Sequence, residues 1–381
     1  MRVGVIGNYG NENNGDEAIL SGIISQLTNE FSLELSDITV FSNRPENTKK
    51  RHDVNVVPLI HKRGKLSIPF TIFHSYRTMR KLDLLIIGGG GLLMDLYKRD
   101  APLYGTLAYL GKKAKCQVIV YGVGAGPLNT RVGKFFVRLL VNCATGIAVR
   151  DPKSKQLLES LGVKKSIKVT TDPAFALKTN IQKPSIPHIK RIGITAVPYF
   201  DKGYWPTEDK VLNRLYIEGM AHNLDKLLDE HDMTLTFYAT KYPEDVEAAR
   251  QIRAEMKHKE KTVLIEERLT PEDIINTSIE QDLVIGTRLH SLILSMVTTT
   301  PVVGIAYHHK VKDFMAAQKL DDLVIPIEDI HMSDQLILRV INLLTQNWNT
   351  YQSLFKQLSD TLYEDASSGL RTLIEESAVF K

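Results

Sequence analysis

Short apolar runs recur along the first half of the chain, and most of them are separated by stretches in which apolar residues return at helical spacing. An unbroken apolar run bounded by polar residues is typical of a buried strand in a parallel sheet, and helices then connect successive strands. The pattern therefore predicts a largely parallel sheet covered by helices on both faces. The expected strands are 2–6, 38–42, 54–57, 83–87, 117–121, 146–149 and 167–170.

A second series of strands follows a break in this pattern. The segment 178–190, KTNIQKPSIPHIK, contains two Pro and several polar residues, which indicates a connection between domains. The expected later strands are 191–197, 234–239, 262–265, 282–286, 301–305 and 322–326. We therefore expect two doubly wound α/β domains, at 1–180 and 190–333, and a helical C-terminal segment at 334–381.

Composition limits the classes of protein and partner. With 381 residues, of which 43% are hydrophobic, the chain can bury two cores of ordinary domain size. A net charge of +4 suits anionic small molecules or a membrane surface, but it is too small to indicate nucleic-acid binding.

Cysteine usage and the lack of export signals favour a cytoplasmic protein. Cys116 and Cys143 have neither the spacing of metal ligands nor that of a disulfide framework, and we assign them no chemistry. The chain shows no charged leader, and no apolar run approaches the roughly 18 residues that span a bilayer. Residues 66–80, LSIPFTIFHSYRTMR, mix apolar, aromatic and basic positions; we favour an ordinary surface helix there, with contact to a membrane surface as the alternative.

The first expected strand leads into the stretch GNYGNENNGDEAIL, which is rich in Gly and Asn. Gly7, Gly10 and Gly15 permit a positive φ or a close backbone approach, and Asn14 or Asp16 could cap the following helix. Neither a dinucleotide fingerprint nor a phosphate P-loop is present. We favour a turn that binds an anion or a sugar over a turn that is merely tight.

Glycines also follow two later strands. Gly88, Gly89, Gly90 and Gly91 come after the strand in DLLIIGGGGLLMD, and Gly124 lies in YGVGAGPLN. Ligands collect at the carboxyl ends of the strands in open parallel sheets, and four adjacent glycines have a large entropic cost. We therefore favour a binding site in these loops over close packing alone.

A charged pair follows the strand GIAV. Arg150 could hold a carboxylate or phosphate at two points, and an Arg150–Asp151 pair that caps the next helix is an equally good interpretation. Asp172 in TTDPAFAL precedes Pro173, so a capping role is the stronger interpretation for that residue.

The second half contains the motif DLVIGTRLHSLILSMVTTTPVVGIAYHHKVKDFM. Strand 282–286 should lead into a helix that begins near Thr287 or Arg288, which places Arg288, His290 and Ser291 in or beside its first turn. A helix N-terminus attracts anions, Arg288 adds a positive charge, and His290 can move a proton near neutral pH.

The next strand, PVVGI, brings Tyr307, His308, His309 and Lys310 to the same edge of the sheet. Two neighbouring strand ends therefore favour an anion site over isolated structural residues. If His308 and His309 are extended, their side chains point in different directions, which makes a metal site there improbable.

Six ordered motifs resemble the polysaccharide pyruvyl transferase family: NNGDEAIL, DLLIIGGGGLLMD, GVGAGPL, AVRDPKS, TDPAFAL and GTRLHSLILSMVTTTPVVGIAYHHKV. The resemblance extends over residues 1 to about 320. It implies a fold similar to GT-B glycosyltransferases, with two Rossmann-like domains facing a cleft. It also implies transfer of a pyruvyl group from phosphoenolpyruvate to a sugar of a cell-wall or extracellular glycan, usually as a cyclic ketal.

By this resemblance, Arg150, His290 and Lys310 form the active-site set. His290 would transfer the proton, Arg150 and Lys310 would bind the anionic donor, and Arg288 would assist. The remaining expected substrate-binding residues are Ser291, Tyr307, Asn14, Asp16, Gly88, Gly89, Gly90, Gly91 and Gly124, with the loops of the first domain on the acceptor. We expect no cofactor and no metal.

The acceptor and its location stay open at this point. A lipid-linked, nucleotide-linked or polymeric glycan would each fit, and a lipid-linked one would bring the protein to the inner face of the membrane. A nucleotide-sugar-dependent glycosyltransferase or epimerase on the same architecture is the alternative enzyme, because the same His and Arg would suit a diphosphate. A third interpretation, a protein that only binds glycan or an enzyme partner, is disfavoured by Arg150, His290 and Lys310.

Overall fold

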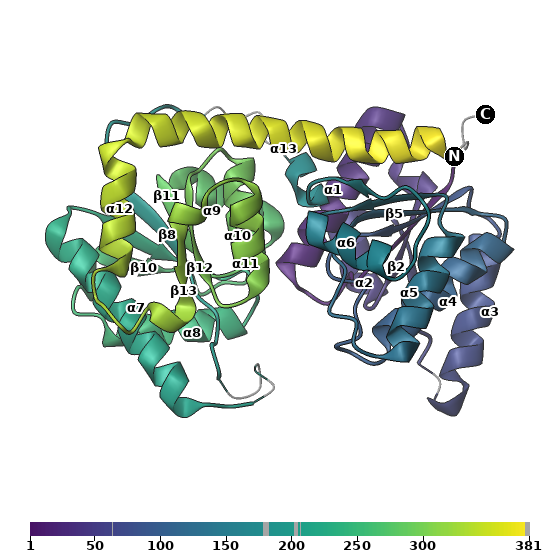
Figure 1. The fold of residues 1–381 in the computed structure, drawn as a ribbon, viewed down its shortest axis with the longest axis horizontal. Helices are drawn as coiled ribbons and strands as arrows, with labels where there is room; N and C mark the ends of the chain where they lie inside the picture. The colour runs from purple at the N-terminus through teal and green to yellow at the C-terminus, as the bar shows by residue number, and fades with distance from the viewer. Residues whose placement is uncertain (63, 178–182, 202–204, 206, 378–381) are drawn as a thin grey trace. The chain divides into compact units, whose positions relative to one another are not determined.

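The computed structural model describes residues 1–62, 64–177, 183–201, 205 and 207–377. They divide into two compact units (Figure 1). Unit 1 contains the residues up to 177 and returns with those from 362 onward, and unit 2 contains the described residues from 183 to 361. We expected a change of domain at 178–190, and the first segment of unit 1 ends at Leu177, just before that range. The helical segment expected at 334–381 consists of α12 and α13, and α13 contributes residues to both units.

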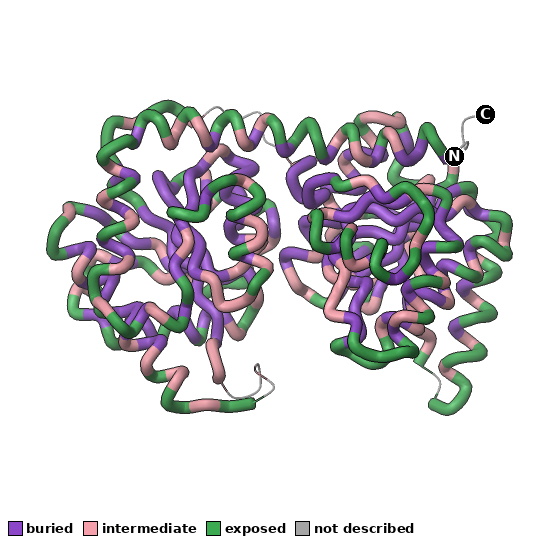
Figure 2. The backbone as a smooth tube through the Cα atoms, in the orientation of Figure 1, coloured by how far each residue is buried: buried purple, intermediate pink, exposed green. Residues whose placement is uncertain are grey.

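Unit 1 is built on a parallel sheet with strand order β3-β2-β1-β4-β5-β6-β7. This order confirms the doubly wound sheet that the apolar runs predict. The core strands are buried along their length because helices cover both faces, as the purple traces in Figure 2 show. Its strands are β1 (Val3–Ile6), β2 (Ile38–Ser42), β3 (Asn55–Pro58), β4 (Leu84–Gly88), β5 (Gln117–Val123), β6 (Gly146–Val149) and β7 (Lys168–Val169).

Two helical layers cover this sheet. On one face, the side chains of β4 and β5 pack with apolar residues of α3 to α6 in a single core that includes Met79, Leu107 and Leu140. On the other face, the Tyr121 hydroxyl donates to Gln26 of α1 and to the carbonyl of Ala366 in α13. The helices are α1 (Asn14–Phe31), α2 (Pro45–His52), α3 (Ser67–Met79), α4 (Asp100–Lys113), α5 (Arg131–Cys143), α6 (Pro152–Ser160) and the last part of α13 (Trp348–Glu376).

Unit 2 repeats the same plan with a parallel sheet of order β10-β9-β8-β11-β12-β13. All six strands fall where apolar runs predict them. The strands are β8 (Arg191–Thr195), β9 (Thr234–Phe237), β10 (Thr262–Leu264), β11 (Leu283–Gly286), β12 (Val302–Ala306) and β13 (Val324–Pro326). The helices are α7 (Lys210–Glu230), α8 (Glu244–Glu255), α9 (Pro271–Glu280), α10 (Leu289–Val297), α11 (His309–Ala317), α12 (Leu336–Gln346) and the first part of α13.

In both units the strand order reverses at one point, between β1 and β4 in unit 1 and between β8 and β11 in unit 2. The loops that leave two such strands run in opposite directions, so a space for a ligand opens between them. The polar and Gly-rich motifs follow the strands at or beside these two points. Among the described residues, no helix is both long and apolar enough to cross a membrane.

Candidate functional site

In unit 1 the Asn-rich loop and the glycine run meet at the carboxyl edge of the sheet. The Tyr9 hydroxyl donates to the carbonyl of Gly88 over 2.7 Å. A Cβ atom added to Gly90 would lie 2.9 Å from a carboxylate oxygen of Asp16. The loops after β1 and β4, which the sequence places far apart, therefore form one surface at the switch point.

Asp16 orders the first of these loops. Its carboxylate accepts hydrogen bonds from the side-chain amides of Asn8, at 2.9 Å, and Asn13, at 3.0 Å. Asn13 is the N-cap of α1, and its side chain accepts from the Gly15 amide. The prediction that Asn14 or Asp16 caps this helix is therefore wrong. The cap is Asn13, and both predicted residues lie inside the first turn, where Asn14 is buried.

The glycine run is explained in part by packing. Gly89 has φ +72° and Gly90 has φ +66°, a conformation that other residues adopt only with strain. A Cβ atom on Gly89 would come within 1.9 Å of Ile19 in α1, and one on Gly88 within 2.7 Å of Ile23. Close contact with α1 thus accounts for Gly88 and Gly89, whereas Gly90 faces the Asp16 carboxylate.

Arg150 lies at the end of β6, on the same edge. Its guanidinium contacts the Asp172 carboxylate at 3.2 Å and is nearly buried. A Cβ atom on Gly124 would lie 3.0 Å from Arg150 Nε, so the glycine leaves room for the guanidinium beside this loop. The sequence allowed two interpretations: Arg150 holds an anion, or an Arg150–Asp151 pair caps the next helix. In the structure the capping residue is Asp151, whose carboxylate accepts a hydrogen bond from the Ser154 amide at the start of α6. Arg150 is held by Asp172 instead.

Asp172 combines this contact with the capping role that the sequence predicts. Its second carboxylate oxygen accepts from the Ala174 amide at the start of a 3-10 turn, Pro173–Leu177. The ion pair with Asp172 holds the Arg150 guanidinium at the sheet edge.

In unit 2 Arg288 occupies the N-cap position of α10. Its guanidinium forms a two-point ion pair with the buried carboxylate of Asp245, at 2.6 Å from Nε and 2.5 Å from the terminal nitrogen. Asp245 also accepts from the Lys241 amide at 2.8 Å. The charge of Arg288 is therefore largely balanced within the protein, which gives this residue a positioning role beside the helix N-terminus.

His290 and Ser291 occupy the second and third positions of α10. The Ser291 hydroxyl is buried, donates to the carbonyl of Arg288 at 2.7 Å and accepts from Thr195 of β8 at 2.9 Å. These bonds fix the first turn of α10 to the switch-point strand. His290 lies within that turn, half-buried, with its Nε2 atom shielded from solvent.

The next strand places Lys310 in the matching position of α11. His308 is the N-cap of α11 and its Nδ1 atom accepts from the Lys310 amide at 3.4 Å. Burial, with the neighbouring His309 and Lys310 charges, lowers the pKa of His308 to about 4, so the ring is neutral at pH 7. The rings of His308 and His309 lie 4.0 Å apart, because the chain turns into a helix at His309 and so does not have the extended form in which the two side chains would diverge.

Tyr307 closes this edge with an aromatic contact. Its ring lies edge-on to Trp205, with the centroids 5.8 Å apart, and Trp205 in turn contacts Tyr199 after β8. Unit 2 therefore brings together Arg288, His290, Ser291, Tyr307 and Lys310 at one sheet edge, and unit 1 brings together Asp16, Gly90, Gly124 and Arg150 at another.

The arrangement in unit 2 is suited to a small anion. The helices α10 and α11 follow neighbouring strands, β11 and β12, and each directs the positive end of its dipole to the same edge. His290 in one first turn and Lys310 in the other add a proton carrier and a positive charge.

The sequence profile of the polysaccharide pyruvyl transferases matches residues 13–309. The chain belongs to this family. The matched region contains Arg150 and His290 and ends one residue before Lys310. The chain is also 23% identical to the amylovoran biosynthesis protein AmsJ of Erwinia amylovora, over 97% of each sequence.

Solved structures share the architecture of this family member at low sequence identity. A glycosyltransferase from Rickettsia africae superimposes with a TM-score of 0.62 at 12% identity, covering 100% of this chain and 98% of the other. A putative UDP-N-acetylglucosamine 2-epimerase from Listeria monocytogenes gives 0.62 at 15% identity, covering 98% and 94%. These likenesses confirm the expected GT-B-type, Rossmann-like fold.

Two acidic residues with clear structural roles escaped the sequence reasoning. Burial opposes ionisation of Asp95, but hydrogen bonds from the Asn129 and Thr130 amides and the Thr130 hydroxyl outweigh it and lower its pKa. Asp95 thereby holds the loop between β5 and α5. Asp95 is the last residue of the motif DLLIIGGGGLLMD, so its position in that motif could have drawn attention to it. No motif near Asp245 indicated that this residue pairs with Arg288.

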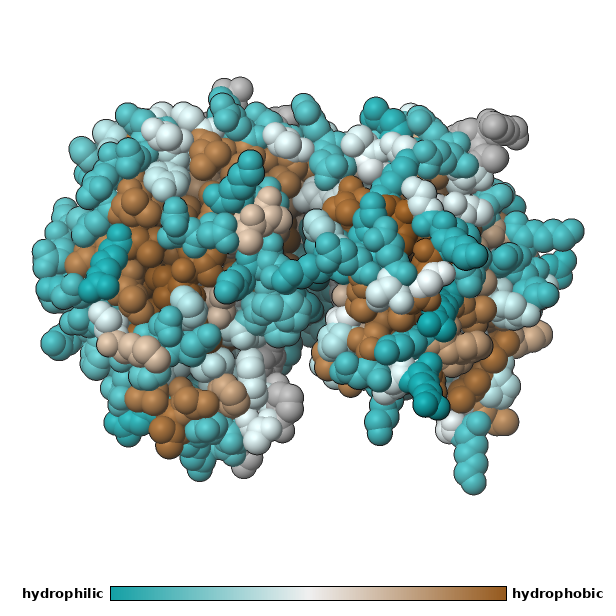
Figure 3. All heavy atoms as spheres, viewed as in Figure 1, coloured by the Kyte–Doolittle hydropathy of each residue, from teal (hydrophilic) through white to brown (hydrophobic). Residues whose placement is uncertain are grey.

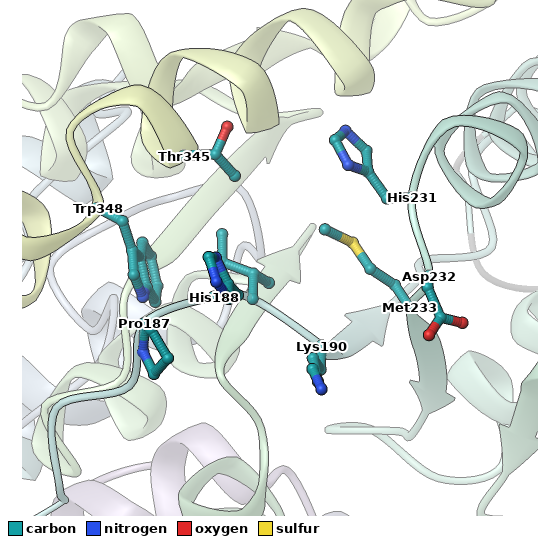
Figure 4. Close-up of a pocket in the computed structure, with 9 residues that line it drawn as sticks. Pro187, His188, Lys190, His231, Asp232, Met233, Thr345 and Trp348 are labelled. Atoms are coloured by element: carbon teal, nitrogen blue, oxygen red, sulfur yellow. The ribbon is translucent and has the colours of Figure 1, made fainter.

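A pocket lies at the opposite edge of the unit 2 sheet, remote from these motifs. It is lined by residues just before β8 and β9 and by the α12–α13 corner, among them His188, His231 and Trp348 (Figure 4). Ligands of doubly wound sheets bind at the carboxyl ends of the strands, so we assign this pocket no part in the activity. The described residues contain no group of three or more His, Cys, Asp or Glu side chains placed to hold a metal ion.

Proposed function

We propose that the protein transfers a pyruvyl group from phosphoenolpyruvate to a sugar of an exopolysaccharide or cell-wall glycan precursor and forms a ketal. Membership of the family supports transfer to a polysaccharide. The observation that carries the choice of donor is the pair of helix N-termini on β11 and β12, with His290 and Lys310 in their first turns.

The donor has the charges that these groups bind. Phosphoenolpyruvate carries a phosphate and a carboxylate, so it needs two anion-binding positions, and helix N-termini together with Lys310 supply such positions. Arg150, oriented by Asp172, is the second cation that we assign to the donor. Arg288 and Ser291 hold the first turn of α10, and Tyr307 packs its ring against Trp205.

The reaction then needs one proton carrier. His290 donates a proton to the methylene carbon, which makes C2 electrophilic, and the oxygen of a first sugar hydroxyl bonds to C2 as its proton is removed. The C2–O bond to phosphate breaks, and inorganic phosphate leaves with the bonding electrons. The oxygen of a second hydroxyl then bonds to C2, and its proton passes to the released phosphate. The product is a cyclic ketal that bears a methyl group and a carboxylate.

The acceptor is assigned to unit 1. We assign the sugar hydroxyls to this loop edge, where Asp16 and Gly91 are partly exposed and Asn14 and Gly88 to Gly90 lie buried beside them. The relative from Erwinia amylovora is named for the biosynthesis of the polysaccharide amylovoran, which supports a glycan acceptor. We propose a lipid-linked precursor at the inner face of the membrane, because phosphoenolpyruvate is a metabolite of the cytoplasm.

The chemistry calls for no cofactor and no metal, because side-chain cations and helix N-termini stabilise the phosphate. Turnover should therefore be the same with and without a strong chelator. A loss of turnover in the chelator that a divalent ion restores would contradict this assignment.

The experiment that tests the donor compares two substrates on one preparation. The protein is mixed with candidate glycan precursors and either phosphoenolpyruvate or nucleotide sugars. We expect release of inorganic phosphate from phosphoenolpyruvate that depends on the glycan. Release of a nucleoside diphosphate from a nucleotide sugar would instead assign the protein to the glycosyltransferase class that shares its fold.

A further inference from the structure

Helix α3 in unit 1 turns its apolar side outward. The residues that it buries are spaced four apart, and two of them, Thr71 and Ser75, are polar. Its exposed side chains include Ile68, at 73% exposure, and Phe73, at 60%. A surface helix normally buries its apolar stripe and exposes its polar one, so this inverted pattern indicates that the outer face meets a further apolar phase.

The neighbouring helices extend this surface. α3, α4 and α5 lie side by side on the same face of the sheet, as the shared core and Figure 1 show. Tyr97 precedes α4 and is 67% exposed, and Phe135 in α5 is 60% exposed. Figure 3 shows brown side chains mixed with teal ones over this region. We call this the α3–α5 surface; its exposed apolar members are Leu66, Ile68, Ile72, Phe73, Tyr76, Leu96, Tyr97, Tyr109, Val132 and Phe135.

Most of these side chains gather near one end of the helical layer. Ile68, Tyr97 and Val132 lie at or just before the first turns of α3, α4 and α5. Helices that connect parallel strands run opposite to them, so these first turns lie at the carboxyl edge of the sheet. The glycine run and Arg150 lie at that edge too. The α3–α5 surface is therefore next to the loops to which we assign the acceptor.

The charge of this region is strongly positive. Residues 54–140 contain 14 Lys and Arg but only three Asp and no Glu, whereas the whole chain has a net charge of +4. One of the three Asp residues, Asp95, is buried. The basic side chains of Lys65, Arg77 and Arg80 are exposed beside the apolar residues of α3. Exposed Lys and Arg around aromatic and aliphatic side chains match an anionic lipid surface in both charge and polarity.

We propose that the α3–α5 surface binds the face of an anionic phospholipid bilayer, with Ile68 and Phe73 inserted among the lipids and the surrounding Lys and Arg on the headgroups. This docking would hold the carboxyl edge of unit 1 at the membrane, where a lipid-linked acceptor is presented. It concerns lipid binding itself and does not depend on the proposed pyruvyl transfer.

Vesicle sedimentation tests the proposal with the full chain. We expect binding to vesicles that contain phosphatidylglycerol, weaker binding as salt is raised, and little binding to pure phosphatidylcholine. The variant Ile68→Ser/Phe73→Ser should lose most of this binding. Its matched control is Val211→Ser/Met332→Ser, which changes side chains of unit 2 with 68% and 69% exposure and should bind as the wild type does.

A charge-reversal pair tests the electrostatic part. Each basic residue near an anionic surface contributes about fivefold to binding, so Arg77→Glu/Arg80→Glu should weaken it by roughly 30-fold or more. Lys259→Glu/Lys356→Glu, at exposed positions of unit 2, is the control variant, and it should change vesicle binding little.

An equal loss of vesicle binding in test and control variants would overturn the proposal. A wild type that forms dimers through this surface but does not bind vesicles would overturn it as well. Activity on a soluble acceptor should be unchanged in all four variants, and its absence from the wild type would contradict only the proposed reaction.

Discussion

Removal of Arg288 should destabilise unit 2 by an amount that the structure allows us to bound. The Asp245 carboxylate has no exposed surface, so Arg288→Met leaves a buried charge whose remaining donors, among the described residues, are the Lys241 amide and the Thr240 hydroxyl. Loss of one partner of a buried ion pair lowers the free energy of unfolding by about 3–5 kcal/mol. Because two donors to Asp245 remain, we expect a loss of about 3 kcal/mol for Arg288→Met. Asp245→Asn should cost less, because Arg288 keeps 14% of its side chain in contact with water.

Tryptophan fluorescence during urea unfolding measures this effect selectively. The sequence has two Trp, Trp205 and Trp348, and both belong to unit 2. The single and double variants form a double-mutant cycle, in which we expect a coupling free energy of about 2 kcal/mol between the two side chains. A coupling below about 0.5 kcal/mol, or an Arg288→Met variant as stable as the wild type, would refute the positioning role of Arg288 and leave the residue available to the substrate.

Three further predictions concern single side chains. Arg150→Lys should bind phosphoenolpyruvate roughly tenfold more weakly in calorimetry although the charge is kept, because an ammonium cannot reproduce the planar grip; unchanged affinity would remove Arg150 from the donor site. His290→Ala should lower turnover by roughly two to four orders of magnitude with the thermal midpoint preserved, and near-normal turnover in His290→Gln would exclude proton transfer. Because burial lowers the pKa of His308 from 6.5 to about 4, the unfolded chain takes up a proton first as pH falls. The wild type should therefore lose unfolding free energy relative to His308→Asn between pH 6.5 and 4, and parallel pH profiles would contradict this.

The strands and the sheet edges could be predicted from the sequence because both depend on local patterns. Runs such as LLIIG and VVGIA are long enough to form a buried strand and too short for a helix, and the residues that follow them reach the carboxyl edge in any parallel sheet. The capping role of Asp172 was predictable for the same reason, since Pro173 follows it directly.

Contacts between distant residues could not be predicted in this way. Arg288 and Asp245 are 43 positions apart, and neither segment carries a sign of the other. The return of α13 to unit 1, where Ala366 accepts from Tyr121, depends on packing over 245 positions. The sequence of α3 shows a mixture of apolar, aromatic and basic residues, but it does not show which side of the helix faces the core. That choice depends on packing against α4 and the sheet.

Transfer of labelled carbon from the donor tests the central claim most directly. The protein is incubated with phosphoenolpyruvate labelled with ¹³C at all three carbons and with lipid-linked glycan precursors, and the glycans are examined by mass spectrometry. We predict a glycan that gains the three labelled carbons of a pyruvyl ketal, with one inorganic phosphate released for each glycan modified. Release of phosphate without label in any glycan, or a glycan extended by a sugar from a nucleotide donor, would contradict the account.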